Sequence, residues 1–144
     1  MRKNVAYKYS AAMGGKKVYR DKMADLELKK AFSELQRKMV GTGQKLQLKD
    51  LQINQIKRVK QENESTCKEF AKLSDDTIIY ESVGRSFILS DINQMKVNLI
   101  AENKNIDEKI IALQNDKLFL TRNLAQSEEN LRELVQQKKK QGDI

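Results

Sequence analysis

The stretch Asp76-Thr-Ile-Ile-Tyr-Glu-Ser-Val-Gly-Arg-Ser-Phe-Ile-Leu-Ser-Asp91 decides the fold of this chain. It is rich in Ile, Val, Tyr, Phe and Thr, which favour strands, and the rest of the sequence has no comparable segment. Gly84-Arg85 lies at its centre, and glycine can adopt the positive φ that a two-residue hairpin loop requires. The stretch therefore predicts a β-hairpin over residues 77–89, with Val83 opposite Ser86 and Tyr80 opposite Leu89.

The two faces of this hairpin differ in apolar content. One face carries Ile78, Tyr80, Phe87 and Leu89. The other face carries both apolar and polar residues, namely Ile79, Val83 and Ile88 together with Glu81, Ser86 and Ser90. Two strands alone are marginally stable in water and leave both edges unpaired, so further strands are expected to come from other chains. The alternative is a cluster within this chain alone. The predicted assembly residues are Ile78, Ile79, Tyr80, Val83, Phe87, Ile88 and Leu89.

The remainder of the chain has the composition of long helices. Its 144 residues are 33% charged and 6% aromatic, and no proline is present to interrupt a helix. From Asp25 the apolar residues recur in alternating steps of four and three, which places them in one line along a helix, the apolar seam of a coiled coil. The same spacing begins again at Ile92. Two long seams on either side of a turning segment predict a mainly α fold, a long antiparallel coiled-coil hairpin with one β-hairpin at its bend.

Caps and interruptions set the predicted helix boundaries. The first helix is expected over residues 24–64, because Thr66 and Glu69 fit a capping box that would start a short helix over 67–73. Ser90 or Asp91 is the predicted cap of a helix over 91–138, with Gln94 three residues past Asp91. Gly41 and Gly43 are expected to soften or bend the first helix. Polar residues interrupt the two seams at Thr42, Lys49, Lys96, Asn103, Lys117 and Ser127.

Residues 1–22 differ from the coiled-coil domain predicted over residues 23–144. They hold seven basic residues and one acidic residue, Asp21, whereas the remainder is nearly balanced in charge. Three interpretations stay open, namely a basic arm for nucleic acid or acidic partners, a transit peptide, and a disordered extension. We favour the disordered extension, because the segment shows no helical apolar period.

The composition argues against an enzyme. The chain has no histidine, one cysteine (Cys67), and no phosphate-binding or dinucleotide-binding glycine pattern. No catalytic, cofactor-binding or metal-binding residue is therefore predicted, and no cofactor is expected. No apolar run approaches the length of a membrane span and no signal-peptide pattern opens the chain, so a cytoplasmic protein without a membrane partner is predicted.

The order of these elements resembles that of the β-type prefoldin subunits. The supporting stretches are Asp25-Leu-Glu-Leu-Lys-Lys-Ala-Phe-Ser-Glu-Leu35, Tyr80-Glu-Ser-Val-Gly-Arg-Ser-Phe-Ile-Leu89 and Glu129-Asn-Leu-Arg-Glu-Leu134. The resemblance implies a subunit of a hetero-hexameric, ATP-independent co-chaperone, in which the hairpins of all subunits form an intersubunit β-barrel. It also implies that the arm tips hold unfolded actin and tubulin and pass them to the cytosolic group II chaperonin.

Apolar residues near the paired helix ends are the candidates for client contact. Leu26 and Val135 lie off the seam and are expected to face solvent, where apolar groups can bind many partners. The other candidates lie on the seam, and the alternative for them is that they only pack the two helices together. The predicted client-binding residues are Leu26, Leu28, Phe32, Leu131, Leu134 and Val135.

A second class of function stays open, a structural or tethering coiled coil that binds nucleic acid through the basic tail. Such a protein has no use for the β-hairpin, so nucleic acid is not the partner that we expect. Mass measurement separates the two classes. A prefoldin subunit assembles only with non-identical partners, whereas a tethering coiled coil forms a stable homodimer.

Overall fold

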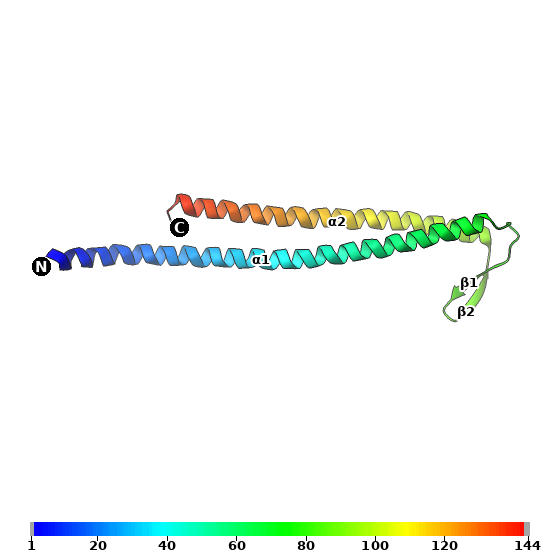
Figure 1. Ribbon diagram of the computed structural model, residues 1–144, viewed down its shortest axis with the longest axis horizontal. Helices are drawn as coiled ribbons and strands as arrows, with labels where there is room; N and C mark the ends of the chain where they lie inside the picture. Colours follow the sequence, from blue (N-terminus) through cyan, green and yellow to red (C-terminus); the bar gives the residue numbers. More distant parts are fainter. Residues whose placement is uncertain (1, 143–144) are drawn as a thin grey trace. The chain divides into compact units, whose positions relative to one another are not determined.

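The computed structural model describes the backbone of residues 2–142 and the side chains of residues 22–23 and 25–142. Helix α1 (Arg2–Ala71) is followed by strands β1 (Ile79–Val83) and β2 (Ser86–Ser90) and by helix α2 (Ile92–Lys140) (Figure 1). This order confirms the predicted fold class, two long helices with a two-stranded antiparallel hairpin between them. The β-barrel between subunits stays a prediction.

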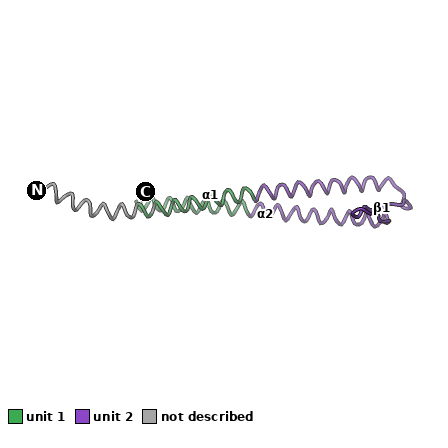
Figure 2. The backbone as a smooth tube through the Cα atoms, turned by 90° about the horizontal axis from the view of Figure 1, so that it is seen from below, with its two compact units in different colours: residues 1–44, 120–144 green, residues 45–119 purple. Residues whose placement is uncertain are grey.

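The chain divides into two units, each built from part of α1 and part of α2 (Figure 2). Unit 1 comprises residues 1–44 and 120–144, and unit 2 comprises residues 45–119. The cross-helix contacts of each unit run in opposite directions along the two helices. In unit 2, for example, Lys49 contacts Asp116 while the later Lys60 contacts the earlier Asp107. The helical segments of each unit are therefore antiparallel, as the two seams predict.

Helix α1 is longer than the sequence predicts. It begins at Arg2, so the segment expected to be a disordered extension is helical, and the absence of proline leaves no residue there that must end a helix. It also continues to Ala71, without the break expected between residues 64 and 67. The Thr66 hydroxyl donates a hydrogen bond to the Glu62 carbonyl at 2.9 Å, which is the bond of a threonine inside a helix and not of a cap.

Helix α2 begins as predicted. The Asp91 carboxylate accepts a hydrogen bond from the Asn93 amide at 3.2 Å, which makes Asp91 the N-cap. The Gln94 side chain donates to Asn98 at 2.9 Å, so the second half of the expected capping box does not form. The helix runs two residues beyond the predicted end, to Lys140, and Gly142 follows it with a φ of 71°.

The register of the hairpin is the predicted one, with Tyr80 opposite Leu89 and Val83 opposite Ser86. Gly84 has a φ of 61° and Arg85 does not have a positive φ, which is the pattern of a type II′ loop with glycine at its first central position. Strand β1 starts at Ile79 and β2 ends at Ser90, so the strands lie slightly later than the predicted range.

Burial follows the seams and is greatest in unit 2. The buried apolar side chains among the described residues are Ile53, Ile92 and Ile106 in unit 2 and Leu131 in unit 1. Ile92 is the most buried, at 1% exposed. Helix α1 is continuous through Gly41 and Gly43, and Thr42 between them is buried on the seam.

Candidate functional site

The β-hairpin presents one apolar face almost bare. Alternation along the strands places Ile78, Tyr80, Phe87 and Leu89 on this face, and their exposed fractions lie between 65% and 74%. The opposite face is less apolar and somewhat less exposed, because Ile79 is half-buried there, whereas Val83 and Ile88 are 50% and 52% exposed. The hairpin therefore does not form the closed intrachain cluster that was the alternative.

The edges of the hairpin are equally open. Within residues 2–142 the sheet has two strands, in the order β1-β2, so each strand has one edge without a strand partner. Unpaired backbone groups at a sheet edge are templates for pairing with another chain. The bare face and the two open edges together form a surface suited to the addition of strands from other molecules.

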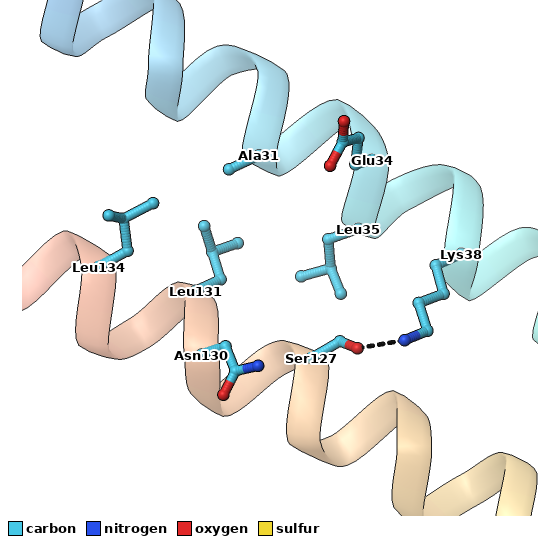
Figure 3. Close-up of a pocket in the computed structure, with 8 residues that line it drawn as sticks. All are labelled: Ala31, Glu34, Leu35, Lys38, Ser127, Asn130, Leu131 and Leu134. Atoms are coloured by element: carbon cyan, nitrogen blue, oxygen red, sulfur yellow. Dashed lines mark hydrogen bonds between the residues drawn. The ribbon is translucent and has the colours of Figure 1, made fainter.

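The helices of unit 1 leave a first groove along their seam, with a volume of about 310 Å³. Figure 3 shows Leu35 from α1 and Leu131 and Leu134 from α2 around it. At one end Lys38 reaches across from α1 and donates hydrogen bonds to the Ser127 hydroxyl and, at 3.1 Å, to the Asn123 side-chain carbonyl. The polar residue at seam position 127 thus has a partner on the opposite helix.

A second groove of unit 1 is larger, at about 460 Å³, and is lined by both apolar and charged side chains. Its apolar wall consists of Phe32 and Leu35 from α1 and of Leu131 and Val135 from α2. Its polar lining comes entirely from α2. In chain order these polar residues are Glu128, Arg132, Gln136 and Lys139.

The predicted client-binding residues differ in accessibility. Leu26 is 59% exposed, as expected of a residue off the seam. Phe32 is on the predicted seam but is 54% exposed, because it lies at the wall of the second groove and not in a closed interface. Val135 was expected to face solvent, but it is half-buried in the same groove. The remaining residues pack into the seam, with Leu131 buried and Leu28 and Leu134 half-buried.

The polar interruptions of the seams in unit 2 are paired across the helices. Lys49 contacts Asp116 at 3.0 Å, and Lys117 contacts Asp50. A lysine can lay its aliphatic stem across an apolar seam and carry its ammonium group to a carboxylate at the edge. A further pair of this kind joins Lys60 to Asp107 at 2.6 Å. Asn63 donates a hydrogen bond across the helices to Asn103 at 3.1 Å, and Lys96 contacts Asp75 of the turn that follows α1 at 3.9 Å.

Sequence reasoning missed these pairs and also missed the apolar residues outside the seams. The sequence did hint at the ion pairs, since acidic residues lie next to the lysines of the seam. To assign each lysine its carboxylate, however, one must know the register between the two helices. On α2 the exposed apolar residues outside the seam are Val97, Ile100, Ile111, Leu118 and Phe119.

Comparison with known proteins identifies the family. A model described as "Prefoldin subunit" matches residues 33–138. The chain belongs to the prefoldin subunit family. Prefoldin subunit 1 of Danio rerio is 43% identical over 117 residues, which cover 81% of this chain and 96% of the relative. Prefoldin subunit 1 of Homo sapiens is 42% identical over the same shares of the two chains.

The prefoldin fold is also that of a solved structure. The prefoldin beta subunit from Thermococcus strain KS-1 superposes with a TM-score of 0.60 over 74% of this chain and 90% of that chain. Its sequence identity is 18%, so the likeness is one of fold. The resemblance to β-type prefoldin subunits, predicted from the hairpin between two coiled-coil arms, is confirmed. Family membership gives the chain a co-chaperone role and assembly with other prefoldin subunits.

The charges of this prefoldin chain are distributed unevenly. Unit 2 has twelve basic and twelve acidic residues, whereas unit 1 has sixteen basic and eight acidic residues. In unit 2 the Asp107 carboxylate accepts a hydrogen bond from Lys60 and raises the pKa of the Lys60 amine above its ordinary value, against a smaller lowering by desolvation. Lys49, Lys60 and Lys117 of unit 2 thus contact carboxylates within their own helix pair.

Among the residues that the structure describes, no group of three His, Cys, Asp or Glu side chains could hold a metal ion. In the same residues, no helix combines the length and the apolar composition that crossing a bilayer requires. The candidate functional surfaces are the bare face of the hairpin and the two grooves of unit 1.

Proposed function

We propose that this chain is one subunit of a hetero-hexameric, ATP-independent prefoldin that captures unfolded polypeptides in the cytoplasm, chiefly actin and tubulin. The hexamer delivers these clients to the cytosolic group II chaperonin. In this proposal the hairpin joins an intersubunit β-barrel and unit 1 contacts the client. The family membership supports the co-chaperone role. The assignment of assembly to the hairpin and of client contact to unit 1 is our inference.

The observation that carries the proposal is the bare apolar face of the hairpin. Full burial of a large apolar side chain stabilises an assembly by roughly 1.5–3 kcal/mol. Four such side chains lie together on this face, beside two open strand edges. Pairing with the hairpins of other subunits would bury the face and satisfy the edges at once. The assembly residues are accordingly Ile78, Ile79, Tyr80, Val83, Phe87, Ile88 and Leu89.

Capture requires apolar surface that stays accessible after assembly. Leu26 and Phe32 provide it directly, because both are more than half exposed in unit 1. Leu28, Leu134 and Val135 are half-buried and contribute the parts of their side chains that face the groove or solvent. Leu131 is buried, so its main contribution is to hold the helices and form the wall of the grooves.

The mechanism is binding and release, without a covalent step. A single small apolar surface binds weakly, but several such surfaces on one platform act at high effective concentration. The client is then held strongly enough to prevent aggregation, while each contact can dissociate separately during transfer to the chaperonin. No cofactor takes part in these steps.

The test is co-expression of the chain with the remaining prefoldin subunits, followed by native mass spectrometry. The wild-type chain is expected to enter a hexamer, and Phe87→Asp and Tyr80→Asp are expected to stay out, because each buries an unpaired charge among the strands. Leu48→Asp is the matched control, since Leu48 is an exposed apolar residue of unit 2 outside the hairpin. It should assemble normally.

Two results would contradict the proposal. One is co-purification of Phe87→Asp with the other subunits at the wild-type yield. The other is a stable homodimer of the wild-type chain that ignores the other subunits, which would favour the tethering coiled coil.

A further inference from the structure

The second groove of unit 1 combines an apolar wall with a charge gradient. Along α2, its polar lining passes from Glu128 through Arg132 and Gln136 to Lys139, so one end is acidic and the other is basic. Because these residues recur three or four positions apart, they lie in one row along the helix. The apolar wall runs beside this row.

The cations of the groove are available for a ligand. Arg132 has a carboxylate neighbour, Glu129, at 3.7 Å, but both side chains are more than half exposed, and such surface pairs contribute little. For Lys139, no carboxylate partner is found among the described residues. The adjacent Lys138 differs, because it contacts Glu27 at 2.5 Å.

The surroundings of the groove add to its positive potential. Unit 1 carries eight more basic than acidic residues, which equals the net charge of the whole chain. Within the part of unit 1 whose side chains the structure describes, ten residues are basic and six are acidic, and Lys138, Lys139 and Lys140 end α2. A positive field around an apolar groove attracts acidic partners and raises their association rate.

We propose that this groove docks unfolded segments in which an apolar residue has acidic residues on one side. The apolar side chain packs against Phe32 and Val135, and the acidic side chains contact Arg132 and Lys139. Glu128 repels acidic groups at the other end, so the acidic flank of the segment points toward Lys139. The proposal rests on the capture function proposed above and adds to it a preference for acidic clients.

The lining favours a polypeptide over a nucleic acid as the occupant. Half of the residues that line the groove are apolar, whereas binding of nucleic acid depends on cations along a phosphate backbone. Glu128 would face that backbone with a like charge. An acidic peptide with an apolar anchor satisfies both the wall and the cations.

The test uses short fluorescent peptides that share one apolar core, followed on one side by Glu, by Gln or by Lys. Each is titrated with the full-length chain, and binding is followed by fluorescence anisotropy. The Glu peptide is expected to bind about tenfold more tightly than the Lys peptide, since two exposed ion pairs change from attraction to repulsion. Added salt should reduce this difference.

Two double variants locate the effect. Arg132→Glu with Lys139→Glu should reverse the order of the peptides. Arg58→Glu with Lys109→Glu is the matched control, because it changes one exposed arginine and one exposed lysine of unit 2 and alters the net charge equally. The control should keep the wild-type order. Phe32→Ser should weaken the binding of all three peptides.

Three outcomes would overturn the inference, and they are distinguishable. If the peptides bind equally and Phe32→Ser weakens them all, capture by the groove stands and the acidic preference is wrong. If no peptide binds, the groove is not a capture surface, which leaves the assembly test of the hairpin unaffected. If a single-stranded oligonucleotide displaces the Glu peptide and Phe32→Ser has no effect, the site is a general polyanion site.

Discussion

The two units are made from the same two helices and both have lysine–carboxylate contacts between them, yet they differ in how much apolar surface they bury. Unit 2 buries Ile53, Ile92 and Ile106 and pairs its seam lysines with carboxylates on the opposite helix. Unit 1 buries Leu131 among its described residues and retains two grooves along its seam. A helix pair can thus be closed in the unit that contains the hairpin and open in the unit that offers a binding surface.

The largest expected effect is the loss of stability when a buried side chain of unit 2 is truncated. Ile92→Ala should lower the free energy of unfolding by about 3 kcal/mol, because it empties a fully buried site. Leu131→Ala in unit 1 should cost less, since Leu131 already borders two grooves. Urea unfolding followed by far-UV circular dichroism measures both. Ile100→Ala, at an exposed position of α2, is the control, and equal losses at Ile92 and Leu131 would remove the contrast.

The glycine pair of unit 1 gives the next largest effect, in the opposite direction. A Cβ atom at Gly41 or Gly43 meets no atom within 4 Å, and both residues are helical. Alanine at both positions should therefore stabilise the chain by about 1–2 kcal/mol in total. Gly84→Ala should destabilise it, because that glycine has a φ of 61°. Thermal unfolding measures the changes, and a loss of stability in the double variant would show that the glycines are needed for close packing.

The third prediction separates capture from assembly. Leu26→Ser with Val135→Ser removes apolar surface from unit 1 and should reduce suppression of client aggregation on the order of twofold, since the other arms remain. Light scattering of a diluted unfolded client at increasing hexamer concentration measures this. Leu48→Ser with Val97→Ser makes the same two changes at exposed positions of unit 2 and should suppress as well as the wild type. Equal suppression by both double variants would exclude Leu26 and Val135 as client contacts.

The smallest effect concerns one ion pair of unit 2, Lys60–Asp107. Because Asp107 raises the pKa of folded Lys60, the pair stabilises the fold below the ordinary pKa of lysine, 10.5, and this stabilisation disappears as pH rises through the raised value. Between about pH 9 and about pH 12, the wild type should lose more stability than Asp107→Asn. Urea midpoints across this range test the difference. Parallel pH curves for the two proteins would mean that the pair contributes nothing to stability.

The sequence predicted features whose geometry is local. Strand alternation and Gly84 were enough for the hairpin register. The position before an apolar seam narrowed the cap to Ser90 or Asp91, and the structure shows that it is Asp91. The helix break predicted at Thr66 was wrong, because the residue types that form a capping box also occur inside a continuous helix. The exposure of Phe32 and the partners of the seam lysines were not predictable, since a seam shows which side of a helix packs but not the distance or register of its partner.

The bare hairpin has a consequence for the supply of subunits. A copy of the chain made without partners exposes an apolar face and two strand edges, which are the features that drive edge-to-edge aggregation. A surplus of this subunit is thus itself an aggregation-prone protein. Its synthesis must be matched to that of its partners, or the unassembled excess must be degraded. Overproduction of this chain alone should therefore increase aggregation in the cell, and the increase should follow the amount of chain that has no partner.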